Sequence, residues 1–115
     1  MDVTYFDFKK ELKGKEIIEK LERAASHAGL ETDKSYITDS SCFNHYYPER
    51  KCVKLEFLKK SFFPGVYTGQ FYTNINEEVT YKKVKLTAYP LKSDKTTDIL
   101  SKKLKEKLED ILNSE

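Results

Sequence analysis

Two segments of the chain carry apolar residues at the spacing of an amphipathic helix. In the first, residues 17–28, apolar side chains recur every three or four positions and charged side chains occupy most of the remaining positions. Gly29 follows this segment and can adopt the left-handed conformation that ends a helix, with Leu30 as the apolar residue that folds back against it. We therefore predict a helix that ends just before Gly29.

The second helical segment lies near the end of the chain. Ser93 or Asp94 can accept hydrogen bonds from the free N–H groups of its first turn. Lys and Glu residues fill its polar side, which is typical of a solvent-exposed helix surface. Its expected apolar stripe consists of Ile99, Leu100, Leu104, Leu108, Ile111 and Leu112.

Between the two helices the period of the pattern changes from 3.6 to 2 residues, which is typical of strands. The clearest strand spans 51–57, where Val53, Leu55 and Phe57 alternate with Cys52, Lys54 and Glu56. In the last strand the apolar residues change from odd to even positions, which predicts a β-bulge near Lys82 and Lys83. Further strands are expected over 36–43, 65–73 and 78–89, with a short edge strand over 3–8.

The order of these elements predicts the fold class. Each helix has one apolar stripe and each main strand has one apolar face, and all of these must be buried together. We therefore expect a single α+β domain over residues 1–115. It is a two-layer sandwich in which a four-stranded, mostly antiparallel meander carries the N-terminal and the C-terminal helix on one face. The other face of the sheet would be polar, basic and aromatic, with no helix left to cover it.

The composition and the charge distribution narrow the class of protein. Hydrophobic residues make up 38% and aromatic residues 13% of the 115 positions, which is too apolar for a disordered chain. No apolar run reaches the roughly 18 residues that cross a bilayer, and the first residues do not read as a signal peptide. We therefore expect a soluble cytoplasmic protein with no membrane partner. The net charge is only +2, but residues 50–93 carry nine basic side chains against three carboxylates, a local charge of +6.

No sequence motif of catalysis or cofactor binding is present. The chain contains no Gly-x-Ser-x-Gly, no His-Glu-x-x-His, no glycine-rich phosphate loop and no dinucleotide-binding fingerprint. Acid–base chemistry needs carboxylates, histidines or cysteines gathered in a pocket, and no spacing in this chain indicates such a cluster. We expect a protein that is not an enzyme, has no cofactor and contains no resident metal.

The two cysteines and two histidines leave alternative interpretations open. Cys42 and His45 have the short spacing of two ligands of one metal. Cys52 and His27 would complete a tetrahedral set for Zn²⁺. Alternatively, a hairpin turn centred on Tyr47 places Cys42 opposite Cys52, as free thiols in a reducing cytosol or as a disulfide in an oxidising compartment.

The basic stretch favours one class of partner, nucleic acid. Sheets that bind single strands combine cations along the path of the backbone with aromatic rings on which the bases stack. Segments of residues 50–93 have this mixture of Lys and Tyr. The candidate nucleic-acid-binding residues are Lys54, Lys82, Lys83, Lys85 and Tyr89.

Two aromatic loops favour a different partner, another protein. Two adjacent phenylalanines in the turn over 61–67 cannot both point inward, and a second loop contains adjacent tyrosines. The candidate partner-binding residues are Tyr46, Tyr47, Phe62, Phe63 and Tyr67. We expect a small binding protein of the inhibitor, immunity, adaptor or assembly type that acts through protein–protein interaction. Nucleic-acid binding is the alternative, and a homodimer through the sheet is a further form that this surface allows.

Overall fold

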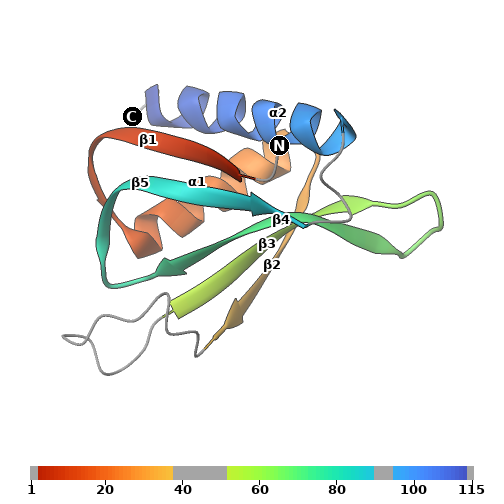
Figure 1. Cartoon of the computed structure of the whole chain (residues 1–115), viewed down its shortest axis with the longest axis horizontal. Helices are drawn as coiled ribbons and strands as arrows, with labels where there is room; N and C mark the ends of the chain where they lie inside the picture. The colour runs from red at the N-terminus through yellow and green to blue at the C-terminus, as the bar shows by residue number, and fades with distance from the viewer. Residues whose placement is uncertain (1–2, 38–51, 90–94, 114–115) are drawn as a thin grey trace.

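The computed structural model describes residues 3–37, 52–89 and 95–113, which form five strands and two helices (Figure 1). The order of elements is β1 (Val3–Lys13), α1 (Gly14–His27), β2 (Glu31–Tyr36), β3 (Cys52–Lys60), β4 (Tyr67–Asn76), β5 (Thr80–Ala88) and α2 (Lys95–Asn113). The α+β class, the antiparallel sheet and the two helices are confirmed. Neither helix of the described part of the chain is long and apolar enough to span a bilayer.

The sheet has five strands in the order β1-β5-β4-β3-β2, and not the expected four. The short edge strand expected over 3–8 is a full strand, β1, which pairs antiparallel with β5. β2 shares only Tyr36 with the strand expected over 36–43, so its first five residues were not predicted, and residues 38–43 lie outside the described residues. β2 is an edge strand of mostly polar, exposed residues, so it has no apolar alternation that a sequence pattern could reveal.

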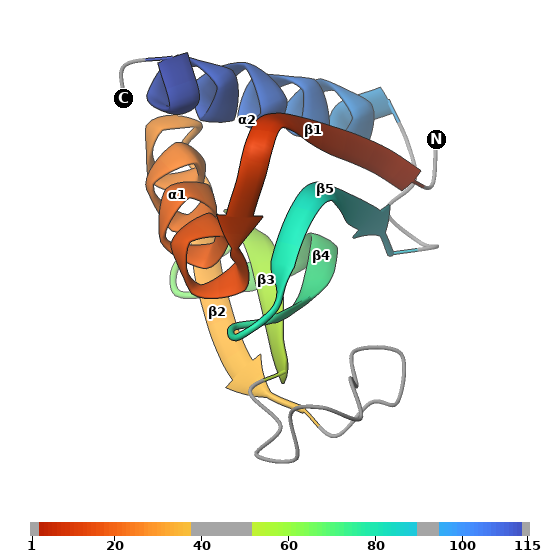
Figure 2. The ribbon, with the colours of Figure 1, turned by 90° about the vertical axis from the view of Figure 1, so that its left-hand side faces the viewer.

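The irregularity expected near Lys82 and Lys83 lies where the pairing of β1 with β5 shifts register. Asp7 pairs with Lys83 and Leu12 pairs with Tyr81, so β1 advances five residues while β5 advances two. Tyr81, opposite the buried Leu12, packs against the core, and so does Val84. The core-facing residues of β5 therefore change from odd to even positions as predicted, while β1 carries the additional residues of the interval. In Figure 2 this is where β1 bends sharply beneath α2.

α1 begins and ends as local chemistry requires. At its end Gly29 has a φ of 76°, and the N–H of Leu30 donates to the carbonyl of Ala25 at 2.8 Å, which confirms the predicted cap. At its start Gly14 donates to the carbonyl of Val79 at 2.7 Å. A Cβ at Gly14 would lie 2.0 Å from the carbonyl oxygen of Asn76, so only glycine allows this close approach to the β4–β5 turn.

α2 buries a stripe that differs from the predicted one at its first turn. Leu104, Leu108 and Ile111 are buried as expected, but Ile99 is 57% exposed. The buried stripe continues instead through Ser101 and Thr97. The Thr97 hydroxyl donates to the side-chain carbonyl of Gln70 at 3.2 Å, which satisfies two polar groups inside the fold. Ser93 and Asp94, the predicted caps, lie outside the described residues.

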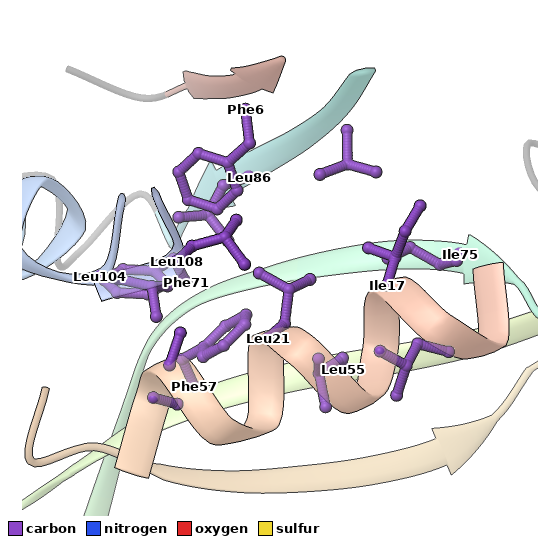
Figure 3. Close-up of a cluster of buried hydrophobic side chains, with 14 of the residues drawn as sticks. Phe6, Ile17, Leu21, Leu55, Phe57, Phe71, Ile75, Leu86, Leu104 and Leu108 are labelled. Atoms are coloured by element: carbon purple, nitrogen blue, oxygen red, sulfur yellow. The ribbon is translucent and has the colours of Figure 1, made fainter. Parts of the chain in front are cut away.

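Both helices pack into one core against the same face of the curved sheet (Figure 2). The close-up in Figure 3 shows α1 lying along the inner side of the strands, with side chains of α2 meeting the far end of the same cluster. The largest members of this core include Phe6, Ile17, Leu21, Leu55, Phe57, Phe71, Ile75, Leu86, Leu104 and Leu108.

Candidate binding surfaces

The face of the sheet that points away from the helices carries polar and aromatic side chains, and we call it the open face. On β3 and β4 the strand register places Lys54 opposite Asn74 and Glu56 opposite Tyr72. On β5 and β1 it places Lys85 opposite Tyr5 and Lys83 opposite Asp7. The open face includes Tyr5, Asp7, Asp33, Ser35, Lys54, Glu56, Tyr72, Asn74, Lys83, Lys85, Thr87 and Tyr89.

Four of the five predicted nucleic-acid-binding residues lie on this face: Lys54, Lys83, Lys85 and Tyr89. Lys82 is exposed to solvent at the change of parity between Tyr81 and Val84, and the described strand pairing does not assign it to this face.

A compact cluster of two tyrosines, one lysine and one glutamate occupies the centre of the open face. The rings of Tyr72 and Tyr89 lie 5.1 Å apart, and Nζ of Lys54 lies 4.9 Å and 5.5 Å from their centroids. The hydroxyl of Tyr89 donates to Oε2 of Glu56. Burial and the Glu56 carboxylate both raise the pKa of Tyr89 well above its ordinary value of 10.0, so it stays a donor.

This cluster needs the glycine that interrupts β4. A Cβ at Gly69 would lie 3.0 Å from the ring of Tyr89 and 3.2 Å from a carboxylate oxygen of Glu56. The Glu56 carboxylate is therefore held against the Tyr89 hydroxyl. It forms no ion pair with any lysine in the described parts of the chain.

The lysines of the open face form no ion pair with a described carboxylate, although Asp7 lies opposite Lys83 and Glu56 shares the face. Nζ of Lys83 lies 4.3 Å above the ring of Tyr5, and no ion pair joins Lys54, Lys83 or Lys85 to a carboxylate within residues 3–37, 52–89 and 95–113. The ammonium groups of Lys54 and Lys83 lie against three tyrosine rings, so this face offers contacts for an aromatic or anionic ligand beside its carboxylates.

A groove opens in the same face where β4 and β5 diverge. The described pairing between these strands consists of Phe71 with Ala88 and Tyr72 with Thr87. Beyond this point lies the β4–β5 groove, of about 470 Å³, lined by Tyr72, Asn74, Tyr81, Lys83, Val84, Lys85 and Thr87. No sequence pattern predicted it, because it depends on how far two strands that are consecutive in sequence remain paired.

Two polar side chains characterise this groove. The hydroxyl of Tyr81 accepts a hydrogen bond from the backbone N–H of Asn76 at 2.9 Å, and burial raises its pKa above 10.0. The side-chain oxygen of Asn74 is buried and accepts no hydrogen bond. A buried amide oxygen without a donor is uncommon in folded proteins.

The second candidate surface is the turn that joins β3 to β4. We call Phe62, Phe63, Val66 and Tyr67 the aromatic tip. Phe62 is 96% exposed and Phe63 is 69% exposed, and their rings meet edge to face at 5.9 Å. Figure 1 shows the β3–β4 hairpin extending away from the body of the fold. The prediction that both phenylalanines cannot point inward is consistent with this exposure, whereas Tyr46 and Tyr47 lie outside the described residues.

The backbone of the tip is well defined by hydrogen bonds. The N–H of Ser61 donates to the carbonyl of Val66 at 2.8 Å, and the N–H of Phe63 donates to the Ser61 hydroxyl at 3.2 Å. Gly65 has a φ of 78°, which lets the chain reverse without strain. The exposed rings are therefore presented by an ordered turn.

The cysteine and histidine residues do not form a metal site in the described parts of the chain. Cys52 is fully buried and disulfide-bonded, and a disulfide sulfur is not the thiolate that binds Zn²⁺. Cys42, the only other cysteine of the sequence, and His45 lie outside the described residues. His27 is the last residue of α1, and no three metal-ligating side chains gather within the described residues.

No protein-family model, curated protein or solved structure matches the chain significantly. Function must therefore be inferred from the chemistry of the open face and of the aromatic tip.

Proposed function

We propose that the protein is a non-catalytic binding protein whose aromatic tip docks into an apolar pocket of a partner protein. The observation that supports this most is the exposure of Phe62 and Phe63 in adjacent positions. Aromatic side chains bury large apolar areas at interfaces and have few rotatable bonds to order. In isolation the tip leaves this apolar area in water, and docking would remove it.

The ordered backbone of the tip favours recognition by shape. The hydrogen bonds of Ser61 hold the turn before any partner arrives, so little conformational entropy is lost on docking. Lys59 and Lys60 are exposed just before the turn. The proposed partner pocket is accordingly apolar at its base and carries carboxylates at its rim.

The test places a photo-crosslinking amino acid at Phe62 and, as a matched control, at Ile99, which is also an exposed apolar residue. We expect one partner to be captured from the native host at Phe62 and not at Ile99. With that partner purified, Phe62→Ser should weaken binding about 30-fold or more, as hot-spot residues do, and Ile99→Ser should not. A partner that binds the Phe62→Ser variant as tightly as the unaltered protein would overturn the proposal. A crosslink to a second copy of the chain would identify a homodimer instead.

A second candidate function, nucleic-acid binding, is supported by the charge of the open face. Lys54 lies beside the rings of Tyr72 and Tyr89, and Lys83 lies above the ring of Tyr5. Neither these two lysines nor Lys85 forms an ion pair with a carboxylate of the described residues. Cations next to stacking surfaces are what single-stranded nucleic acids require. Substitution of these lysines by glutamine should weaken binding and reduce the dependence of affinity on salt, because each phosphate contact releases a counterion.

A further inference from the structure

β2 forms one edge of the sheet, and its outer side is unpaired within the described residues. On its inner side it pairs with β3, from Glu31 opposite Leu58 to Tyr36 opposite Val53. In the order β1-β5-β4-β3-β2 no described strand follows it, and Figure 2 shows β2 at the margin of the sheet. The edge of a sheet presents a row of backbone donors and acceptors to which another strand can bind.

One hydrogen bond identifies the residues of β2 whose backbone groups point outward. The N–H of Ile37 donates to the carbonyl of Cys52 at 3.0 Å, and the register of β2 with β3 places these two residues directly opposite each other. In an antiparallel ladder, opposite pairs alternate between those that exchange hydrogen bonds and those that do not. The residues that bond to β3 are consequently Glu31, Asp33 and Ser35. The residues that direct their N–H and C=O groups to the free edge are Thr32, Lys34 and Tyr36.

The side chains at this edge include a large exposed ring. Tyr36 lies opposite the fully buried Val53, on the side of the sheet that the helices cover, and yet it is 64% exposed. Lys34 lies on the same side and is also exposed. The described helices therefore leave the edge uncovered, and an aromatic ring stands beside unpaired backbone groups. Such a ring is apolar area that a neighbouring strand would bury.

The charges of β2 disfavour most ways of pairing two copies of this edge. A two-fold axis makes the strands antiparallel and must bring outward residues opposite outward residues. An axis at Lys34 or at Asp33 would place that residue opposite its own copy, and like charges directly opposite are destabilising. An axis at Thr32 would place Glu31 opposite Asp33, again with like charges. Among axes from Thr32 to Ser35, only the one at Ser35 avoids such pairs.

We propose that β2 pairs antiparallel with β2 of a second copy of the chain, about a two-fold axis at Ser35. Lys34 then lies opposite Tyr36 of the second copy, so its ammonium group meets an aromatic ring and not another cation. The two serine hydroxyls face each other at the axis, where they hydrogen-bond. Lys34 and Tyr36 form two equivalent pairs of two backbone bonds each, about four hydrogen bonds in total.

The dimer has a continuous sheet and presents two aromatic tips. The axis is normal to the sheet, so both open faces lie on one side. The aromatic tip follows β3 beyond Leu58, which pairs with Glu31, so antiparallel pairing directs the two tips in opposite directions. A partner with two pockets would be bound with avidity. This inference goes beyond the proposed function and does not depend on it, because β2 contains none of the tip residues.

The first test measures association of the full chain by sedimentation equilibrium between about 10 µM and about 1 mM, since a contact through one short strand is weak. We expect an equilibrium between monomer and dimer. Lys34→Pro removes an outward N–H that pairing with β3 does not use, so the variant should fold and should dimerise about tenfold or more weakly. Lys34→Ala, the matched control, keeps this N–H and should lose less affinity than the proline variant.

The second test examines the register and does not require the proline variant to fold. Ser35→Cys places two introduced thiols opposite each other at the axis, within disulfide distance, so mild oxidation should join the two copies. Asp33→Cys is the matched control, because Asp33 lies on the same face but opposite Ile37 of the second copy. Cys52 is fully buried and disulfide-bonded, which protects it from exchange with the introduced thiols.

Three outcomes overturn the proposal. The first is a chain that stays monomeric at about 1 mM. The second is a folded Lys34→Pro variant, verified by circular dichroism, that dimerises as tightly as the unaltered protein. The third is covalent dimer in equal yield from Ser35→Cys and Asp33→Cys, which would exclude the register. None of these outcomes affects docking by the aromatic tip, which the crosslink at Phe62 tests separately.

Discussion

The two faces of the sheet differ in chemistry although the same strands form them. On β3, Val53, Leu55 and Phe57 are fully buried against the helices. Lys54 and Glu56, which alternate with them, point to the open face and contact the rings of Tyr72 and Tyr89. Residues that stabilise the core and residues that face the open side of the sheet therefore alternate along β3. Substitutions on odd and even positions of β3 should have effects of different size and kind.

The largest expected effect is on the covered face. Phe57→Ala removes a fully buried ring that lies 5.3 Å from the ring of Phe71, and we expect it to lower the free energy of unfolding by about 3–5 kcal/mol. Urea denaturation followed by circular dichroism measures this. Lys54→Ala, three residues earlier and on the open face, should cost less than about 1 kcal/mol. Equal losses for the two variants would show that the faces are not separated as described.

A smaller and pH-dependent effect is expected for the cluster at the centre of the open face. Tyr89→Phe removes the hydrogen bond to Glu56 and should lower the free energy of unfolding by about 1 kcal/mol at neutral pH. Because the folded protein raises the pKa of Tyr89, its contribution is complete below pH 10 and is lost as the pH rises through the raised value.

Unfolding measured at neutral pH and again above pH 10 tests this sign. The unaltered protein should lose stability over this interval, and the Tyr89→Phe variant should lose less, because it has no ionisable group at this position. Tyr81 and Tyr36 also have raised pKa values. Both tyrosines are present in the unaltered protein and in the Tyr89→Phe variant, so their pH-dependent contributions to stability cancel in the comparison. A stability difference that does not change with pH would place the role of Tyr89 in packing alone.

The smallest expected effect has the opposite direction. Asn74→Leu removes a buried amide oxygen that has no donor, so the free energy of unfolding should stay unchanged or rise by up to about 1 kcal/mol. Thermal unfolding without ligand measures this. A loss of more than about 1 kcal/mol would mean that the amide is satisfied within the folded protein.

Much of the fold followed from local pattern. The end of α1 at Gly29 and Leu30 and the alternation of β3 needed only nearby residues to be predicted. The five-stranded sheet did not, because the pairing of Val3 with Thr87 joins distant parts of the chain. The prediction that Ile99 belongs to the buried stripe of α2 was wrong for a related reason. The polar residue Thr97 is buried at the start of α2 because Gln70, from a distant strand, accepts its hydrogen bond.

The residues of the candidate surfaces could be predicted only where the alternation of side chains along a strand determines the face on which each residue lies. Lys54 reaches the open face because β3 alternates regularly, and Lys83 and Lys85 reach it after the change of parity in β5 that the sequence predicted. The β4–β5 groove has no distinguishing sequence signal, since it arises where β4 and β5 cease to pair. The cytoplasmic location stays a prediction, and the disulfide at Cys52 is more typical of oxidising compartments.

The pairing of β1 with β5 has a consequence for how the chain acquires its structure. β1 is synthesised before β5, so Val3 cannot complete its backbone hydrogen bonds until Thr87 has left the ribosome. Until then Phe6 and Phe8 have no β5 side chains to pack against. Closing so long a loop is entropically costly and slow, so the pairing of β1 with β5 forms late in folding. A nascent chain that stops before β5 is therefore a target for chaperones or proteases.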